Sequence, residues 1–339
     1  MRKRDSVDEA PDPWQAKEAL ERALFEIRKV IAGQDVMLER VLVCLLTGGH
    51  LLIEGVPGLA KTLTVKTTAA VLGGSFKRVQ FTPDLVPSDL VGTRIFRPDR
   101  SEFETELGPV FCNFLLADEI NRAPAKVQSA LLEVMQEHQV TIGHETHYVP
   151  DPFLVMATQN PIESEGTYPL PEAQVDRFML KILVDYPLHD EELTVVHRSL
   201  ASAPELPQVL SIEELRALQK TVDHVYVDPA LVTYSVKLAS ASRNPGEVGL
   251  DELAPYLSFG ASPRGPISLI RAARALAVLR GRDYVLPADV DELAKDALRH
   301  RLVLSYEALA EERTPDSILD ALVEAVTPPP IDLSTSTAA

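Results

Sequence analysis

One stretch near position 55 constrains the chain more than any other part of the sequence. Residues 51–62 read LLIEGVPGLAKT, so a short apolar run is followed by a turn rich in Gly and Pro and then by Lys-Thr. A buried strand, a flexible loop and a helix that opens with Lys-Thr are the parts that a phosphate-binding loop needs. Backbone N–H groups surround the phosphates, the lysine neutralises their charge, and the hydroxyl is a ligand for Mg²⁺. The alternative is an ordinary turn with a surface lysine.

This stretch departs from the general phosphate-loop pattern at one position. The pattern G-x-x-x-x-G-K-[ST] holds from Gly55 to Thr62, except that Ala60 stands where the last glycine is expected. The departure matters only if residue 60 needs a positive φ, which alanine tolerates poorly.

Length and composition limit the classes of protein that this chain can represent. The chain has 339 residues, of which 45% are hydrophobic, and therefore can bury a large core that we expect to divide into two domains. Its formal net charge of −17 argues against sequence-independent binding to nucleic acid or to an anionic membrane. Cys44 and Cys112 lie in apolar runs and suggest no disulfide framework. No signal peptide or membrane-spanning segment is apparent, so we expect a soluble, cytoplasmic protein without direct membrane insertion.

Strands and helices alternate through the first half of the sequence. This alternation predicts a five-stranded parallel α/β sheet with right-handed crossovers, and two further stretches, 91–107 and 140–149, are typical of hairpins. After residue 187 we expect helices only. The predicted strands are 51–53, 77–81, 110–117, 153–158 and 179–184, and the predicted helices are 14–30, 35–46, 62–72, 124–137, 212–222, 229–242, 267–279 and 290–302.

The expected domain organisation follows from the change, after residue 187, from alternating strands and helices to helices only. It comprises a flexible tail at 1–15, an α/β nucleotide-binding domain at 16–187, a linker at 188–207, a helical lid domain at 208–326 and a second flexible tail at 327–339.

Polar residues follow two of the most apolar predicted strands. Asp118 and Glu119 end one strand, and Asn160 in ATQNP ends another. Ligands bind at the carboxyl ends of strands in open parallel sheets, so one carboxylate can hold the Mg²⁺ shell and the other can polarise the attacking water. Asn160 can hydrogen-bond the γ-phosphate or orient that water. The alternatives are a strand that ends in acidic loop residues and an Asn-Pro turn.

Two arginines are candidates for stabilising charge on a transferred phosphoryl group. Arg177 lies in EAQVDRF before the last predicted strand, and Arg264 lies in GASPRGP before a predicted helix of the second domain. In phosphoryl transfer, a guanidinium commonly stabilises the negative charge that develops on the transferred group. The alternatives are a salt bridge of Arg177 with a nearby aspartate and a solvated helix start at Arg264.

Five segments together resemble the MoxR family of AAA+ ATPases, and the similarity extends from about residue 30 to about residue 304. The segments are GVPGLAKT, LLADEINRAPAKVQSALLEVMQE, ATQNP, EAQVDRF and GASPRG. The resemblance implies a Walker A motif with Lys61 and Thr62, a Walker B motif with Asp118 and Glu119, sensor 1 at Asn160, an arginine finger at Arg177 and sensor 2 at Arg264. Arg122 stays open as a second candidate for the finger.

The resemblance also implies the extent of the nucleotide site. Val30, Ile31 and Gln34 approach the adenine, the hairpin at 91–107 resembles the helix-2 insert of the family, and the hairpin at 140–149 resembles its pre-sensor hairpin. Ala60 is ordinary for this family. The phosphate-binding residues that the resemblance implies are Gly55, Val56, Pro57, Gly58, Leu59, Ala60, Lys61, Thr62 and Leu63.

We therefore expect an ATPase that uses ATP and Mg²⁺ between the α/β and helical domains and forms a ring, a hexamer, through sharing of the site. The resemblance implies chaperone-like remodelling of protein clients or metal-cofactor enzymes, with a partner that contains a von Willebrand factor A domain. One alternative is a nucleic-acid motor, which needs basic and aromatic hairpin tips, whereas residues 140–149 contain no Lys or Arg. Another is a nucleotide-gated scaffold with little turnover. A metal site at His138, His144 and His147 is the weaker explanation of those histidines, because no cysteine or set of carboxylates accompanies them.

Overall fold

The computed structural model of the protein describes residues 10–56, 59–161, 167–200 and 204–331. These residues divide into two compact units. The α/β unit comprises residues 21–174 and 182–215, and the helical unit comprises residues up to 20, 175–181 and 216 onwards. No helix among the described residues combines the length and the apolar character that crossing a membrane requires.

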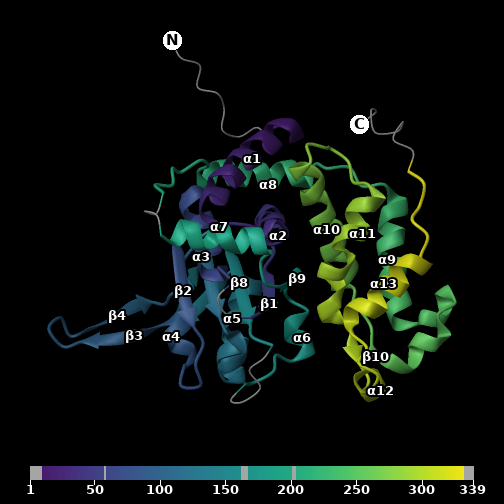
Figure 1. The fold of residues 1–339 in the computed structure, drawn as a ribbon. Coiled ribbons are helices and arrows are strands. Elements are labelled where there is room, and N and C mark those ends of the chain that lie inside the picture. The colour runs from purple at the N-terminus through teal and green to yellow at the C-terminus, as the bar shows by residue number, and fades with distance from the viewer. Residues whose placement is uncertain (1–9, 57–58, 162–166, 201–203, 332–339) are drawn as a thin grey trace, which may run out of the picture. The chain divides into compact units, whose positions relative to one another are not determined.

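The α/β unit contains a five-stranded parallel sheet with the strand order β2-β5-β8-β1-β9 (Figure 1). The prediction of five strands in this fold class is confirmed. Leu115 and Leu116 in β5, one of the inner strands, are completely buried, because helices cover both faces of the sheet. The strands are β1 (Leu51–Gly55), β2 (Phe76–Gln80), β5 (Phe114–Asp118), β8 (Leu154–Gln159) and β9 (Leu180–Val184).

Helices follow most of these strands. Helix α2 packs against β1, and α3 packs against β2 and β5. Helix α7 (His189–Ser199) occupies most of the stretch that we expected to be a linker. That prediction missed the helix because its first turn carries three acidic residues and none of its side chains is buried. The other helices are α1 (Pro13–Val30), α2 (Asp35–Thr47), α3 (Lys61–Val71), α4 (Pro87–Val91), α5 (Ala125–Glu137), α6 (Glu172–Val175) and the 3₁₀ turn η1 (Ile120–Arg122).

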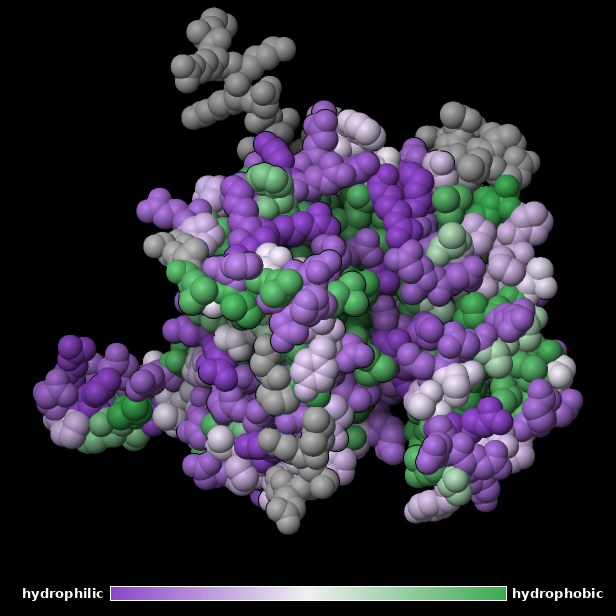
Figure 2. Space-filling view, in the orientation of Figure 1, coloured by the Kyte–Doolittle hydropathy of each residue, from purple (hydrophilic) through white to green (hydrophobic). Residues whose placement is uncertain are grey.

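Both predicted hairpins are present in the α/β unit. The first pairs β3 (Gly92–Arg97) with β4 (Glu102–Leu107), and the second pairs β6 (Gln139–Ile142) with β7 (Glu145–Tyr148). The β3–β4 hairpin is mostly hydrophilic, with a small hydrophobic patch beside the charged tip (Figure 2). Residues Phe96 and Phe103 contribute exposed rings there, with centroids 5.2 Å apart.

The two hairpins contact each other through Arg94 on β3. Gly143, in the turn of the second hairpin, has a φ of +67°. A Cβ atom at Gly143 would lie only 2.6 Å from Cδ of Arg94, so both the backbone conformation and the space favour glycine.

The helical unit is built around the packing of α10 against α11. Buried alanines on α10, such as Ala272 and Ala273, leave room for the neighbouring helix. The expectation of helices only is wrong in one respect, because β10 (Leu257–Phe259) pairs with β11 (Val303–Leu304). Strands of two and three residues are too short to show an alternating pattern. The helical elements are α8 (Ile212–Asp223), α9 (Pro229–Arg243), η2 (Pro245–Val248), η3 (Asp251–Tyr256), α10 (Arg264–Leu279), α11 (Pro287–Leu298), η4 (Arg299–Arg301), α12 (Tyr306–Ala310) and α13 (Pro315–Ala325).

Candidate nucleotide-binding site

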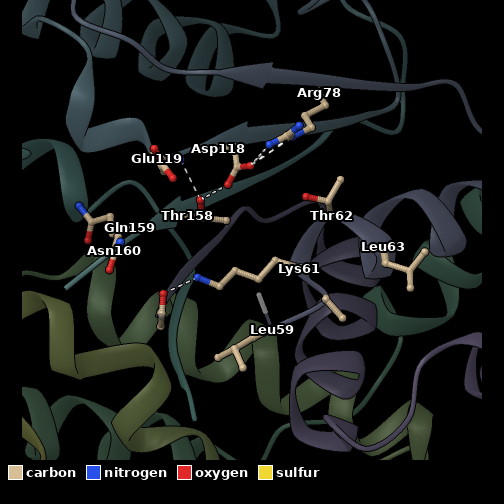
Figure 3. Close-up of a pocket in the computed structure, with 12 residues that line it drawn as sticks. Leu59, Lys61, Thr62, Leu63, Arg78, Asp118, Glu119, Thr158, Gln159 and Asn160 are labelled. Atoms are coloured by element: carbon tan, nitrogen blue, oxygen red, sulfur yellow. Dashed lines mark hydrogen bonds and ion pairs between the residues drawn. The ribbon is translucent and has the colours of Figure 1, made fainter. Parts of the chain in front are cut away.

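A cavity of about 410 Å³ lies at the carboxyl edge of the sheet, in the α/β unit (Figure 3). It forms there because β1, β5 and β8 are neighbours and end at the same edge. The polar residues that follow these strands therefore face one space, as the sequence predicts. The lining residues are Gly55, Leu59, Ala60, Lys61, Thr62, Leu63, Arg78, Asp118, Glu119, Thr158, Gln159 and Asn160.

Lys61 is the first residue of α3, and its side chain extends back to the residue that ends β1. Its Nζ donates a hydrogen bond of 2.5 Å to the carbonyl oxygen of Gly55, at the other end of the loop. Burial lowers the pKa of Lys61, and the carboxylates of Asp118, Glu119 and Glu54 oppose that shift. The ammonium is therefore held in a partly dehydrated position where a phosphate can replace the carbonyl. Pro57 and Gly58, which we expected in this loop, lie outside the described residues.

Ala60 immediately precedes α3 and adopts the left-handed conformation, with φ 55° and ψ 14°. The position that usually carries glycine thus does require a positive φ here. Alanine occupies it at a cost of roughly 1–2 kcal/mol, because its Cβ approaches the following carbonyl.

Asp118 is the last residue of β5, and two neighbouring side chains hold its carboxylate. Thr158 on β8 donates from Oγ1 to one oxygen, Oδ1, at 2.6 Å. Arg78 on β2 donates to the other oxygen, Oδ2, from Nη2 at 2.6 Å and from Nε at 3.1 Å. The carboxylate is therefore fixed in orientation at the edge of the cavity (Figure 3).

Glu119 also occupies the left-handed region, with φ 56° and ψ 50°. Its backbone N–H donates to Oγ1 of Thr158 at 2.8 Å, and its Oε2 lies 2.9 Å from Nε of Arg122. This backbone conformation turns Glu119 away from the path of the strand, so that Glu119 and Asp118 both line the cavity. A single hydroxyl, that of Thr158, connects the two acidic residues.

The oxygen atoms of this edge suit Mg²⁺, which prefers hard oxygen ligands and keeps several waters. The hydroxyl of Thr62 points toward Thr158 and Asp118 (Figure 3). Thr62 and Asp118 are therefore the residues whose oxygen atoms would hold the ion, which stays a prediction, and Lys61 lines the same cavity. In the part of the chain that the structure describes, no cluster of three His, Cys, Asp or Glu side chains is placed to hold a metal, and that includes His138, His144 and His147.

Several predicted site residues lie away from this cavity. Among the described residues, Val30, Ile31, Gln34 and Val56 do not line it. Ile31 is buried in the core, and Gln34 donates from Nε2 to the carbonyl oxygen of Asp185 at 3.2 Å.

Of the remaining candidates, Asn160 lines the cavity and is 8% exposed. Arg177 and Arg264 belong to the helical unit, where Arg177 is half-buried and Arg264 is exposed at the first residue of α10. The assignment of roles to these three residues stays a prediction.

Sequence reasoning missed two residues that shape the site. Arg78 points at Asp118 because β2 and β5 are neighbours in register, with Gln80 opposite Asp118. Thr158 lies two residues before Asn160 in ATQNP. Thr158 could have been noticed in the sequence, because it is a hydroxyl residue near the end of a predicted strand. Arg78 could be found only once the order of the strands was known.

Comparison with known proteins shows which family this chain resembles. The model of the ATPase family associated with various cellular activities (AAA) matches residues 50–180, and an AAA lid domain model matches residues 252–322. The protein Chaperone MoxR1 of Mycobacterium tuberculosis is 56% identical over 313 residues, which cover 92% of this chain and 83% of that protein. Protein MoxR of Paracoccus denitrificans is 34% identical over 335 residues, 93% of this chain and 97% of the relative. The chain belongs to the MoxR family of AAA+ ATPases.

A solved structure agrees with this assignment to the MoxR family. The crystal structure of a Cytophaga hutchinsonii protein assigned as an ATPase shares 47% sequence identity, with a TM-score of 0.89. It covers 94% of this chain and 97% of its own. The MoxR-family fold, an α/β AAA domain followed by a helical lid, is therefore that of the present protein, and the cavity at residues 55–63 lies within the matched AAA region.

Proposed function

We propose that the protein binds ATP with Mg²⁺ in the cavity at the carboxyl edge of its sheet and hydrolyses it. The observation that carries this proposal is the convergence of Lys61, Thr62, Asp118 and Glu119 on that cavity. The cation can bind phosphate, the hydroxyl and one carboxylate can bind a metal ion, and the second carboxylate can activate water.

Each residue has a role that follows from its position. Lys61 binds the terminal phosphates in place of the Gly55 carbonyl. Thr62 and Asp118 hold the Mg²⁺ shell, and the bound ion neutralises negative charge on the phosphates. Glu119 orients and polarises the attacking water, and Asn160 hydrogen-bonds the γ-phosphate. The Arg122–Glu119 ion pair, with 2.9 Å between the charged atoms, would have to open for that role.

The quaternary arrangement and the client are the finer parts of the proposal. Arg177 of a neighbouring subunit acts as the arginine finger, and this sharing of residues produces a ring, which we propose to be a hexamer. Arg264 acts as sensor 2. The name of one relative, Chaperone MoxR1, supports a chaperone-like role. We propose further that hydrolysis drives remodelling or assembly of a client protein, together with a partner that contains a von Willebrand factor A domain.

Two substitutions test the proposed division of labour. Lys61→Ala should abolish or greatly weaken binding of a fluorescent ATP analogue, because the phosphates lose their loop cation. Glu119→Gln should keep that binding and lose hydrolysis, measured as phosphate release. Lys66→Ala, at an exposed position of the same helix, is the matched control and should preserve both. Equal loss of nucleotide affinity in Lys61→Ala and Glu119→Gln would contradict the assignment.

The same assay separates protein remodelling from a nucleic-acid motor. Neither single- nor double-stranded DNA should stimulate hydrolysis near physiological salt, because the chain carries 33 basic against 50 acidic residues. Stimulation several-fold by DNA, with a steep dependence on salt, would favour the motor instead.

A further inference from the structure

Arg301, at the end of η4, is an arginine with almost no access to solvent. Its side chain is 1% exposed, although a guanidinium is among the groups least often buried. A buried cation is tolerated only when an opposite charge and hydrogen-bond acceptors surround it. The acceptors around Arg301 come mainly from residues 176–179 of the same unit, a segment without regular structure at the start of β9.

The contacts of Arg301 bracket Arg177 on both sides. On one side, Nε donates to Oδ1 of Asp176 at 2.8 Å and Nη2 donates to the Asp176 carbonyl at 3.1 Å. On the other side, Nη2 donates to the carbonyl of Phe178 at 2.9 Å and Nη1 donates to that of Met179 at 3.3 Å. One planar, rigid group thus fixes the backbone before and after Arg177.

The charges of this cluster are complementary. Burial lowers the pKa of Arg301 to about 10, and the Asp176 carboxylate opposes the shift, so the guanidinium is charged at neutral pH. Asp176 is itself largely buried and also accepts hydrogen bonds from Oγ of Ser262, at 3.0 and 2.9 Å. The Arg264 guanidinium reaches the same carboxylate at 3.4 Å. Asp176 therefore connects the segment around Arg177 to the first turn of α10.

We propose that Arg301 is a positioning residue for Arg177, and that Asp176 is the anchor through which it acts. The inference rests on the proposed role of Arg177 as a finger that completes the site of a neighbouring subunit. A long arginine side chain reaches a phosphate productively only if its backbone is held still, and a displacement of about 1 Å can cost roughly 100-fold in rate. The partners of Arg301 among the described residues all belong to the helical unit, whereas the cavity lies in the α/β unit. Loss of Arg301 should therefore spare nucleotide binding in its own subunit.

The purely structural alternative is that this buried ion pair only stabilises the helical unit. A matched control separates the two explanations. Arg299, two residues earlier on η4, has a side chain that is 9% exposed and pairs with Asp296 and Asp316. Arg299 also donates a hydrogen bond of 2.8 Å to the backbone carbonyl of Lys181. Lys181 lies in β9, after the segment 176–179 that Arg301 holds. Arg299→Lys therefore removes a buried arginine network of similar size without touching residues 176–179.

The first measurement compares steady-state ATPase rates of Arg301→Lys and Arg299→Lys with those of the unaltered protein. A lysine keeps the charge at position 301 but cannot bridge acceptors on both sides of Arg177. We expect kcat to fall roughly 10- to 100-fold in Arg301→Lys, with the KM for ATP changed less than about twofold. Arg299→Lys should change kcat little. Equal losses in the two variants, or a loss confined to KM, would overturn the proposal.

The second measurement is complementation in mixed rings, with subunit exchange and assembly verified by size. Arg177→Ala mixed with Lys61→Ala should recover activity, since some sites combine an intact pocket with an intact finger. Arg301→Lys mixed with Lys61→Ala should recover more activity than Arg301→Lys mixed with Arg177→Ala, in which every finger is absent or misplaced. Strong recovery in that last mixture contradicts the role of Arg301.

A control and a second variant complete the test. Failure of the Arg177→Ala and Lys61→Ala mixture despite exchange would instead refute a finger in trans, independently of Arg301, and the positioning role would fall with it. If Arg301→Lys does not fold, Asp176→Asn replaces it, because the amide keeps the shape of the anchor and the same failure to complement Arg177→Ala is expected.

Discussion

Arg78 and Asp118 form an ion pair across neighbouring strands, with 2.6 Å between Nη2 and Oδ2. The side chain of Arg78 is 47% exposed and that of Asp118 is 16% exposed. The proposed metal ligand is thus already neutralised by a cation in the described structure. A Mg²⁺ ion held by Asp118 would therefore have to compete with Arg78, or approach the carboxylate through its water shell.

We predict that Arg78→Gln lowers the Mg²⁺ concentration needed for half-maximal ATPase activity. The effect should be roughly fivefold or less, because a half-exposed ion pair is worth about 1 kcal/mol at most. The measurement is ATPase rate against free Mg²⁺ at saturating ATP. Lys77→Gln, an exposed position on the same strand, is the matched control. A higher Mg²⁺ requirement in Arg78→Gln would mean that Arg78 assists metal or phosphate binding instead of competing with it.

Thr158→Val should slow hydrolysis without abolishing nucleotide binding. The hydroxyl accepts from the Glu119 N–H and donates to Asp118, so its loss frees both acidic residues from their orientation. We expect kcat to fall by roughly 10- to 100-fold, the scale of a misplaced catalytic group. Thr158→Ser restores the hydroxyl and should recover most of the activity in the same phosphate-release assay. A serine variant as slow as the valine variant would show that the lost methyl packing, not the hydrogen bonds, matters.

Ala60→Gly should stabilise the α/β unit by roughly 1 kcal/mol. Glycine adopts the observed φ of 55° without the Cβ clash, although it also gives the unfolded chain more freedom. Ala70→Gly, at an exposed position inside α3, is the control and should destabilise the unit by a similar amount. Urea unfolding followed by circular dichroism compares the two. Destabilisation by both glycines would show that the surrounding loop offsets the strain at position 60.

The stability of the α/β unit should fall below pH 6.5 through His50. Its Nε2 lies 3.1 Å from the Met135 carbonyl, and its Nδ1 accepts the Val155 N–H, so the neutral ring is required. Burial lowers the pKa of His50 to about 4, below the value in the unfolded chain. The unfolded state therefore takes up a proton between about pH 6.5 and pH 4 that the folded state does not, and stability is lost as the pH falls.

This loss amounts to roughly 2 kcal/mol between pH 7 and pH 5. It should be absent from His50→Gln, which can donate and accept like the neutral ring but cannot take up the proton. Urea unfolding at the two pH values measures the difference, and His144→Gln, at an exposed turn of the same unit, is the control. An equal pH dependence in the unaltered protein and in His50→Gln would contradict this account.

Much of the α/β unit could be predicted from the sequence because its strands are apolar runs bounded by polar residues. The same feature located Gly55, Asp118 and Asn160, since each marks the end of a strand. Arg78 could not be predicted, because its contact depends on β2 lying beside β5, and strand order is not encoded locally. Helix α7 was missed because its apolar side chains stay exposed. Arg301 and residues 176–179 are about 120 residues apart in the chain, so their interaction could not be predicted from local sequence spacing.

The contact between Arg94 and Gly143 has a mechanical consequence. The Arg94 side chain packs on the turn of the second hairpin and also places its guanidinium carbon 5.1 Å from the centre of the Phe103 ring. A displacement of one hairpin should therefore be transmitted to the other in part through the Arg94 side chain. A side chain at position 143 would meet Arg94 and disturb this contact, so the two hairpins should move together only while residue 143 is glycine.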